Sequence, residues 1–276
     1  MTNYFPLIST KELARIIDNE NIIIFDASNG KGSKEHFDKE HISGAIHIDL
    51  ETELSAIEKD PKNGGRHPLP HPNDFAETLS LKGLKPNDHV VIYDDNNGGI
   101  AAARFWWMLK SYGHVNVQVL NGGFTAAKKN GIPMDSERIK SIKSDYPISN
   151  WNLPTIDMNE VKIASENVNS LIIDVRNPER YGGISEPIDK KAGHIPSAIN
   201  IYYFNNMAED GLFKSSEELV EMYQRTLLNK EEVILHCGSG VTACHTILAL
   251  NIAGFPFPKL YVGSWSEWSR REDENQ

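Results

Sequence analysis

The sequence predicts an α/β protein of two tandem domains, each with a mainly parallel β-sheet flanked by helices. Three observations support this fold class. A length of 276 residues suits two domains of ordinary size better than one core. Short apolar runs, typical of buried strands, alternate with longer stretches typical of helices. Four features also occur in the same order in both halves, which indicates an internal duplication.

The first two repeated features predict strands. An apolar run that ends in or passes through an aspartate occurs at residues 21–27 and again at 171–176. A His-Ile turn followed by small and apolar residues occurs at 41–48 and at 194–201. Such short apolar runs are typical of strands that are buried on both faces.

The other two repeated features join strands to helices. Residues 90–107 and 233–244 both read as an apolar strand, a glycine-containing loop and a helix. Residues 119–124 and 260–265 both read as a strand, a glycine turn and an aromatic residue. One such match could be a coincidence of composition, but four matches in order favour duplication.

The domain boundaries follow from these repeats. We expect a first domain at residues 1–140, a linker at 141–158 and a second domain at 159–276. The linker contains two prolines and has weak periodicity. Trp106 and Trp107 are expected in the core of the first domain. The charged residues 269–276 have no apolar anchors and are expected to be a disordered tail.

The two copies differ at the strand-to-helix loop. The second copy has Cys237 where its strand ends, whereas the first has residues 94–97 (DDNN) and contains no cysteine. The second domain is therefore predicted to carry the chemistry, and the first to serve as scaffold and as a wall of the active site.

The loop around Cys237 has the composition of an anion-binding nest. Gly238 and Gly240 allow backbone conformations that are closed to other residues, so successive N–H groups can turn toward one point at a helix N-terminus. Such a site stabilises a thiolate, and equally a persulfide or a substrate oxyanion. The alternative is an inert buried cysteine, which would have no need of Gly-Ser-Gly at this junction.

The number and spacing of the cysteines limit the possible disulfides, metal sites and cellular location. Cys244 lies seven residues after Cys237, about 10 Å along a helix, too far for a disulfide, so it is expected in the core. Two cysteines form no disulfide framework and no short-spaced zinc set. A reducing, cytoplasmic location without a bound metal is predicted.

The overall charge and hydropathy exclude two classes of partner. A net charge of −10 disfavours nucleic-acid binding. No run approaches the ~20 apolar residues of a membrane span.

Residues 237–245 (CGSGVTACH) closely resemble the active-site loop of the 3-mercaptopyruvate sulfurtransferases, within the two-domain rhodanese superfamily. The His-Ile motifs and residues 263–268 (GSWSEW) resemble further signatures of that family, and the resemblance extends from about Ser9 to Trp268. It implies a ping-pong reaction: the Cys237 thiolate takes sulfur from a small donor and passes it to a thiol, such as a thioredoxin-like protein, or to cyanide. It implies no cofactor, and a monomer or weak dimer.

The resemblance also implies roles for particular residues. Ser239 would donate a hydrogen bond to the leaving enolate, with His67 and Glu51 from the first domain assisting it. The alternative for His67 is an ordinary histidine of a surface loop. The loop residues expected to bind substrate are Gly238, Gly240, Val241 and Thr242.

Recognition of the substrate carboxylate is expected from arginine, whose planar fork matches two oxygens. Arg180 matches one of the family's two substrate arginines. The second is expected after a Glu-Pro pair, where this chain has Ile188. Lys190 or Lys191 could supply the charge instead, without the bidentate geometry.

The loop composition favours one donor over another. Thiosulfate-specific relatives place cationic side chains inside the loop, where this chain has Gly238 and Ser239. This favours 3-mercaptopyruvate as the donor, with thiosulfate as the alternative.

Three more distant alternatives remain. A cysteine phosphatase would need a longer loop that ends in arginine, but Ala243 stands six residues after Cys237. A non-enzymatic interaction module would not need the intact cysteine loop. A dithiol redox protein fits poorly with the seven-residue cysteine spacing.

Overall fold

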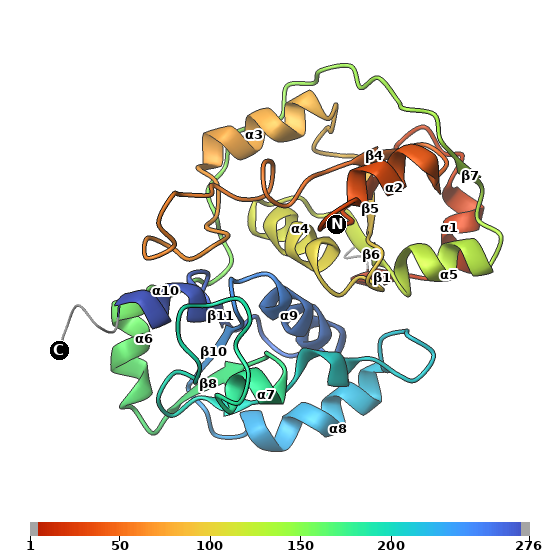
Figure 1. Ribbon diagram of the computed structural model, residues 1–276. Coiled ribbons are helices and arrows are strands. Elements are labelled where there is room, and N and C mark those ends of the chain that lie inside the picture. The colour runs from red at the N-terminus through yellow and green to blue at the C-terminus, as the bar shows by residue number, and fades with distance from the viewer. Residues whose placement is uncertain (1–4, 272–276) are drawn as a thin grey trace. The chain divides into compact units, whose positions relative to one another are not determined.

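The computed structural model describes residues 5–271 and divides the chain into two compact units (Figure 1). The first unit runs to Leu54 and also includes Pro70–Asn152 and Glu209–Phe213. The second includes Ser55–Leu69, Leu153–Ala208 and the chain from Lys214 onward. Each unit thus takes one segment from the other half of the sequence.

The first unit contains a five-stranded, wholly parallel sheet in the order β1-β6-β5-β2-β4 and a separate antiparallel pair, β3 with β7. Its strands are β1 (Leu7–Ile8), β2 (Ile22–Asp26), β3 (His41–Ile42), β4 (Ala45–His47), β5 (His89–Tyr93), β6 (Val117–Leu120) and β7 (Met134–Asp135). Its helices are α1 (Thr10–Ile16), α2 (Ser33–Lys39), α3 (Pro72–Leu81), α4 (Ala101–Ser111) and α5 (Gly123–Lys129).

Helices cover both faces of this sheet. Consecutive residues of β2 point to opposite faces, as strand geometry requires. Ile24 packs in a cluster with residues of α1, α2 and α5, whereas the ring of Phe25 meets Phe105 of α4 at 5.1 Å. Trp106 and Trp107 of α4 are fully buried, which confirms that they belong to the core.

The second unit contains a four-stranded parallel sheet in the order β11-β10-β8-β9. Its strands are β8 (Ser170–Asp174), β9 (Ile199–Asn200), β10 (Glu232–His236) and β11 (Lys259–Leu260). Its helices are α6 (Met158–Ser165), α7 (Pro178–Tyr181), η1 (Tyr203–Asn206), α8 (Ser216–Leu227), α9 (Thr242–Ile252) and α10 (Ser264–Arg271). One core cluster joins α6 and α10 to β8 and β10, while α9 packs on β10 and against α8.

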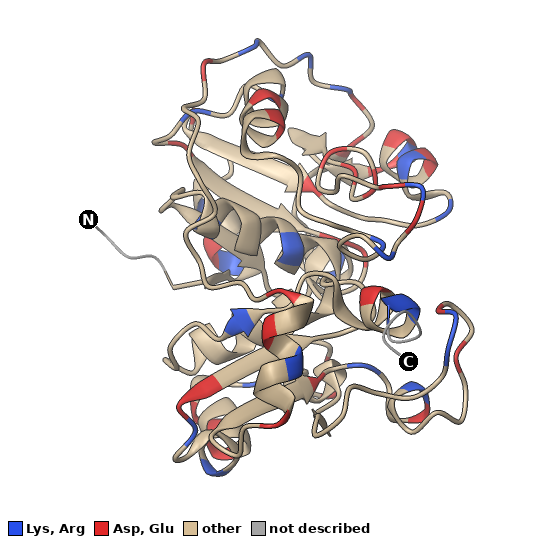
Figure 2. Ribbon diagram, turned by 90° about the vertical axis from the view of Figure 1, so that its left-hand side faces the viewer, with Lys and Arg blue, Asp and Glu red and all other residues tan. Residues whose placement is uncertain are grey.

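The predicted α/β class with parallel sheets flanked by helices is confirmed, and the duplicated runs correspond to matching strands. Acidic and basic residues are interspersed over the ribbon of each unit (Figure 2). No helix among residues 5–271 is long and apolar enough to cross a membrane.

The domain assignment of residues 55–69 differs from the sequence expectation, which placed this segment in the first domain. In the structure they are part of the second unit. The Gly64 N–H donates to Glu267 Oε1 at 3.1 Å and the Arg66 N–H donates to Ser266 Oγ at 3.1 Å. These bonds fasten the segment to the start of α10.

The expectation of a disordered tail from residue 269 was wrong for its first three residues. Ser269 is fully buried, and α10 continues to Arg271. The Arg270 guanidinium donates to the buried carboxylate of Asp189 at 3.1 Å, so its charge is neutralised inside the fold. Residues 272–276 lie outside the described part of the chain.

Candidate active site

Cys237 follows strand β10 directly and is 2% exposed. Its N–H donates to Ser264 Oγ at 3.2 Å, and its carbonyl accepts the N–H of Trp265 at 3.1 Å. Ser264 has a φ of +54°, unusual for a residue other than glycine, and its hydroxyl also donates to the carbonyl of Tyr261 at 2.9 Å. The start of α10 therefore holds the cysteine backbone at two points.

The first unit shows what the duplicated loop can bind. Asp94 comes directly after strand β5, and Cys237 comes directly after strand β10. The two strands end in equivalent ways, since Tyr93 pairs with Asp26 on β2 and His236 pairs with Asp174 on β8. The fully buried Asp94 carboxylate accepts four backbone N–H bonds of 2.7 to 3.1 Å. The donors are Asn96, Gly98, Ile100 and Ala102. Burial raises the pKa of Asp94, and these four bonds oppose that effect. A strand-loop-helix unit of this type thus surrounds a carboxyl group with N–H donors at the position where the second unit has its thiol.

The two loop glycines serve different purposes. Gly240 has a φ of +72°, and a Cβ there would lie 2.6 Å from the carbonyl oxygen of Val262. Gly238 does not have a positive φ, so its expected role in backbone freedom was wrong. A Cβ on Gly238 would instead lie 3.0 to 3.5 Å from the guanidinium groups of Arg66 and Arg180. Gly238 therefore leaves room for cationic side chains.

The helix after the loop begins as expected. Val241 is the N-cap residue of α9 and Thr242 is its first residue. Cys244 is fully buried, which confirms its place in the core, and its thiol lies 3.4 Å from the carbonyl oxygen of Gly240.

Ser239 and His67 are brought together by the structure. Ser239 Oγ lies 2.8 Å from His67 Nδ1, although 172 residues separate the two in the sequence. Ser239 is 6% exposed and His67 is half-buried. The site therefore contains a hydrogen-bonded hydroxyl–imidazole pair two residues after the thiol.

The segment that carries His67 is fixed by close backbone contact as well as by its hydrogen bonds. Gly65 has a φ of +83°, and a Cβ there would lie 2.4 Å from the carbonyl oxygen of Gly263. Glu267, which accepts the Gly64 N–H, also accepts the hydroxyl of Tyr261 at 2.9 Å. These contacts fix the approach of residues 64–67 to the start of α10.

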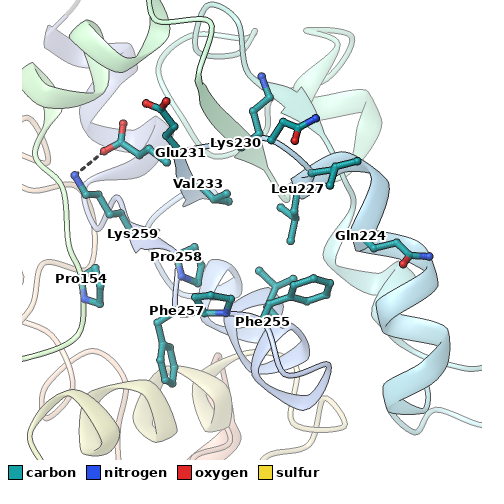
Figure 3. Close-up of a pocket in the computed structure, with 15 residues that line it drawn as sticks. Pro154, Gln224, Leu227, Lys230, Glu231, Val233, Phe255, Phe257, Pro258 and Lys259 are labelled. Carbon is teal, nitrogen blue, oxygen red and sulfur yellow. Dashed lines mark ion pairs between the residues drawn. The ribbon is translucent and has the colours of Figure 1, made fainter.

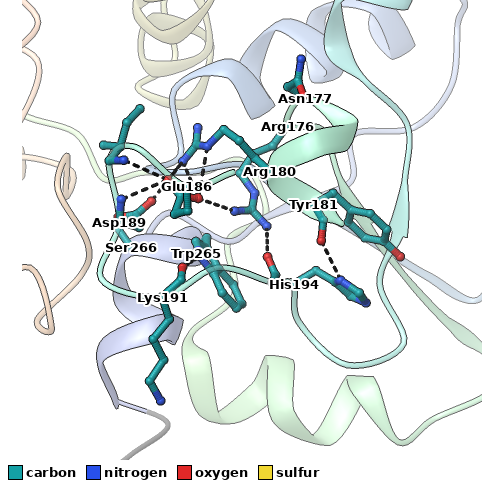
Figure 4. Close-up of polar contacts among 12 residues, drawn as sticks. Arg176, Asn177, Arg180, Tyr181, Glu186, Asp189, Lys191, His194, Trp265 and Ser266 are labelled. Carbon is teal, nitrogen blue, oxygen red and sulfur yellow. Dashed lines mark hydrogen bonds and ion pairs between the residues drawn. The ribbon is translucent and has the colours of Figure 1, made fainter. Parts of the chain in front are cut away.

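Arg180 of α7 belongs to a cluster of charged side chains (Figure 4). Its guanidinium lies 3.4 Å from the position of a Cβ on Gly238, so the cluster is next to the cysteine loop. It donates to Glu186 at 2.9 and 3.1 Å through Nη2 and to Asp189 at 3.2 Å. Burial opposes the charge on Glu186, but the bonds from Arg180 and from the Ile188 and Asp189 N–H groups outweigh it and lower the pKa of that carboxyl.

Sequence reasoning missed most of this cluster. Asp189 has a fully buried side chain and pairs with Arg66, Arg180 and Arg270. Arg176 pairs with Asp174 at 2.6 Å and with Glu186 at 3.1 Å. The local sequence signals for it are Arg66, next to His67, and Glu186, in the Glu-Pro pair.

The side chains of the other candidates in this segment are exposed or point elsewhere, and one candidate lies in the first unit. Ile188 is 54% exposed, and Lys190 is exposed. The side chain of Lys191 points away from the carboxylates in Figure 4, while its carbonyl accepts the indole N–H of Trp265 at 2.9 Å. Glu51 belongs to the first unit, and its catalytic role stays a prediction.

No cluster of three or more side chains suited to metal binding occurs among residues 5–271. An apolar cavity of about 760 Å³ does occur in the second unit (Figure 3). It is lined by Glu232 and Val233 at the start of β10 and by Phe255 and Phe257. Cys237 follows the other end of that five-residue strand, about 16 Å away. The cavity is therefore separate from the thiol.

A buried thiol at the carboxyl end of a parallel strand, with guanidinium groups next to its glycine loop, is typical of an enzyme with a cysteine nucleophile. The Rhodanese-like domain family matches residues 9–130 and 157–271. The chain belongs to this family and contains two of its domains, which confirms the resemblance seen in the sequence.

Individual relatives extend this result. A probable 3-mercaptopyruvate sulfurtransferase of Pseudomonas aeruginosa is 35% identical over 95% of this chain and 94% of its own. Thiosulfate sulfurtransferase of Rattus norvegicus is 33% identical over 97% of this chain and 93% of its own. The crystal structure of SseA from Escherichia coli, a 3-mercaptopyruvate sulfotransferase, matches with a TM-score of 0.81 and 28% identity, over 96% of this chain and all of its own.

Proposed function

We propose that this sulfurtransferase takes sulfur from 3-mercaptopyruvate, holds it as a persulfide on Cys237 and delivers it to a thiol or to cyanide. The observation that carries the proposal is the Ser239–His67 pair, 2.8 Å from Oγ to Nδ1, in the same loop as Cys237. A thiol alone would accept sulfur, but this donor also needs a hydrogen-bond donor for its leaving enolate.

The first half-reaction transfers one sulfur atom. The Cys237 thiolate attacks the thiol sulfur of 3-mercaptopyruvate, an S–S bond forms, and the bond from that sulfur to C3 breaks. The electron pair of the broken bond gives the enolate of pyruvate. The proton of the substrate thiol ends on C3, so the products are the Cys237 persulfide anion and pyruvate.

The Ser239–His67 pair serves the leaving group in this proposal. The hydroxyl of Ser239 stabilises the developing enolate oxygen, and His67 moves the proton from the substrate thiol toward the carbon. The proposal keeps Glu51 as an assisting residue, on the family resemblance. The N–H groups of the loop from Gly238 to Thr242 bind the persulfide, by analogy with the Asp94 nest of the first unit.

The local charge supports an anionic donor. Four arginines of the cluster (66, 176, 180 and 270) face the carboxylates of Asp174, Glu186 and Asp189. The guanidinium groups outnumber the carboxylates by one, which offsets the charge of the Cys237 thiolate and lets a donor carboxylate approach it. Thiosulfate stays the second candidate, because guanidinium groups next to Gly238 also suit its oxygens.

The second half-reaction regenerates the thiolate. Attack on the outer sulfur by cyanide gives thiocyanate, and transfer to a thiol gives a new persulfide, with the Cys237 thiolate released in both cases. The proposed acceptors include thioredoxin-like thiols. The two cysteines are free thiols, which supports the proposed reducing, cytoplasmic setting, and a monomer or weak dimer is the proposed state.

The test compares the two donors on the same preparation. We expect kcat/KM for 3-mercaptopyruvate to exceed that for thiosulfate, and mass spectrometry to detect one added sulfur on Cys237 after exposure to the donor. Cys237→Ser should abolish both signals, whereas Cys244→Ser should keep them. A preference for thiosulfate would overturn the donor assignment, and turnover by Cys237→Ser would overturn the mechanism.

A further inference from the structure

Arg66 reaches the residue that follows the nucleophile. A Cβ atom placed on Gly238 would lie 3.0 Å from Nη2 of Arg66 and 3.4 and 3.5 Å from Nη2 and Nη1 of Arg180. Two guanidinium groups from distant parts of the sequence therefore converge at one point beside Cys237. A side chain at position 238 would crowd the ends of both guanidinium groups.

The position of Arg66 is built by the fold. Its backbone N–H is bonded to Ser266, and its guanidinium is paired with the buried carboxylate of Asp189. The same carboxylate pairs with Arg180 through its other oxygen. Asp189 thus holds the two guanidinium groups side by side. The side chains of Arg66 and Arg180 are 22% and 19% exposed, so both remain accessible to a small ligand.

Arg270 also pairs with Asp189, but the three atoms nearest to a Cβ placed on Gly238 all belong to Arg66 and Arg180. Lys190 is exposed, and Lys191 points away from the cluster (Figure 4). Arg176 has a side chain that is 1% exposed and is engaged by Asp174, Glu186 and the carbonyl of Gly193. A guanidinium also binds a carboxylate through two parallel N–H bonds, which an ammonium group cannot do.

We propose that Arg66 and Arg180 together bind the carboxylate of the sulfur donor, and that Arg66 is the second substrate arginine of this chain. Arg66 thus supplies the charge that the sequence position of Ile188 lacks. This inference rests on the proposed function, because it names the recognition element for the same donor.

The first experiment measures recognition without turnover. Iodoacetate and iodoacetamide alkylate Cys237 by the same displacement of iodide, but only iodoacetate has a carboxylate. We expect Arg66→Ala to lower the ratio of the iodoacetate rate to the iodoacetamide rate about tenfold, the effect of one lost charge-assisted contact. Arg66→Lys should give an intermediate ratio. Arg138→Ala, which removes an exposed arginine paired with Asp38, should leave the ratio unchanged.

The iodoacetamide rate reports whether the cysteine loop is intact in each variant. If Arg66→Ala changes both rates by the same factor, or changes neither, Arg66 does not bind the carboxylate and the inference is wrong. A ratio for Arg66→Lys equal to that of the unsubstituted protein would overturn the bidentate role.

Steady-state kinetics separate the two proposals. With 3-mercaptopyruvate as donor, Arg66→Ala should raise KM about 10- to 100-fold with a smaller change in kcat. If the unsubstituted protein does not turn over 3-mercaptopyruvate, the proposed function fails, whatever the alkylation ratios are. If it does and Arg66→Ala has the same KM, only the inference about Arg66 fails.

Discussion

Acid sensitivity of the second unit should depend on His245, which lies on helix α9 after the cysteine loop. This histidine is fully buried. Its Nδ1 accepts the side-chain amide N–H of Asn206 at 3.2 Å, and its Nε2 lies 3.3 Å from the sulfur of Met207. The imidazole is therefore held in its neutral form with the proton on Nε2. Burial lowers the pKa of His245 from 6.5 to about 3.

The expected magnitude follows from proton linkage. Below about pH 6.5 the unfolded chain binds a proton at this histidine and the folded chain does not, so the free energy of unfolding decreases as the pH falls. The decrease is about 1.4 kcal/mol for each pH unit between the two pKa values, or about 2 kcal/mol from pH ~7.5 to pH ~5. Burial also lowers the pKa of His236 in the same unit, so the unsubstituted protein should lose more than this.

The assay is urea unfolding of the unsubstituted protein and of His245→Gln across this pH range. Near neutral pH the variant should be the less stable of the two, because the substitution disturbs a packed site. The difference in the free energy of unfolding between the two proteins should be about 2 kcal/mol smaller at pH ~5, since the variant has no imidazole to titrate. His36→Gln, at an exposed histidine of the first unit, controls for the general effect of replacing a histidine by glutamine. A pH-independent difference for His245→Gln would refute the reasoning.

Three further predictions concern the two loops. His67→Ala should lower kcat/KM for 3-mercaptopyruvate about 100-fold by removing the partner of Ser239, with an unchanged iodoacetamide rate at Cys237; a loss of both would indicate a structural role instead. Gly238→Ala should raise KM for the donor about tenfold, because the added methyl group displaces the flexible ends of Arg66 and Arg180. The urea midpoint of this variant should change little. An unaltered KM would argue against the anion site. Asp94→Ala should destabilise the first unit by about 3 kcal/mol or more in urea unfolding, because four backbone N–H groups lose their acceptor; a change below about 1 kcal/mol would contradict the nest.

Much of the site could be read from the sequence because its centre is local. Residues 232–242 form a strand, a loop and the start of a helix, and short-range geometry is enough to place Cys237 at their junction. The purpose of Gly238 could not be read in this way. It depends on Arg66 and Arg180, which approach from other segments.

The charged C-terminal residues show the same limit. Sequence reasoning treats Arg270 as a solvated residue of a tail, because charge without apolar anchors is usually exposed. In the fold it meets the buried carboxylate of Asp189, 81 residues away, and the helix continues through it. A compensating charge of this kind cannot be recognised from local composition.

The sequence by itself determined the α/β class, the duplication, and the position of Cys237, since strand period and glycine placement are properties of neighbouring residues. Only the tertiary structure decided which charges surround the thiol. It brings His67 to Ser239 across 172 residues, assigns residues 55–69 to the second unit, and gathers three arginines on Asp189. The physical reason is that a buried carboxylate and its guanidinium partners are stable only together, and the folded chain alone brings them within reach of one another.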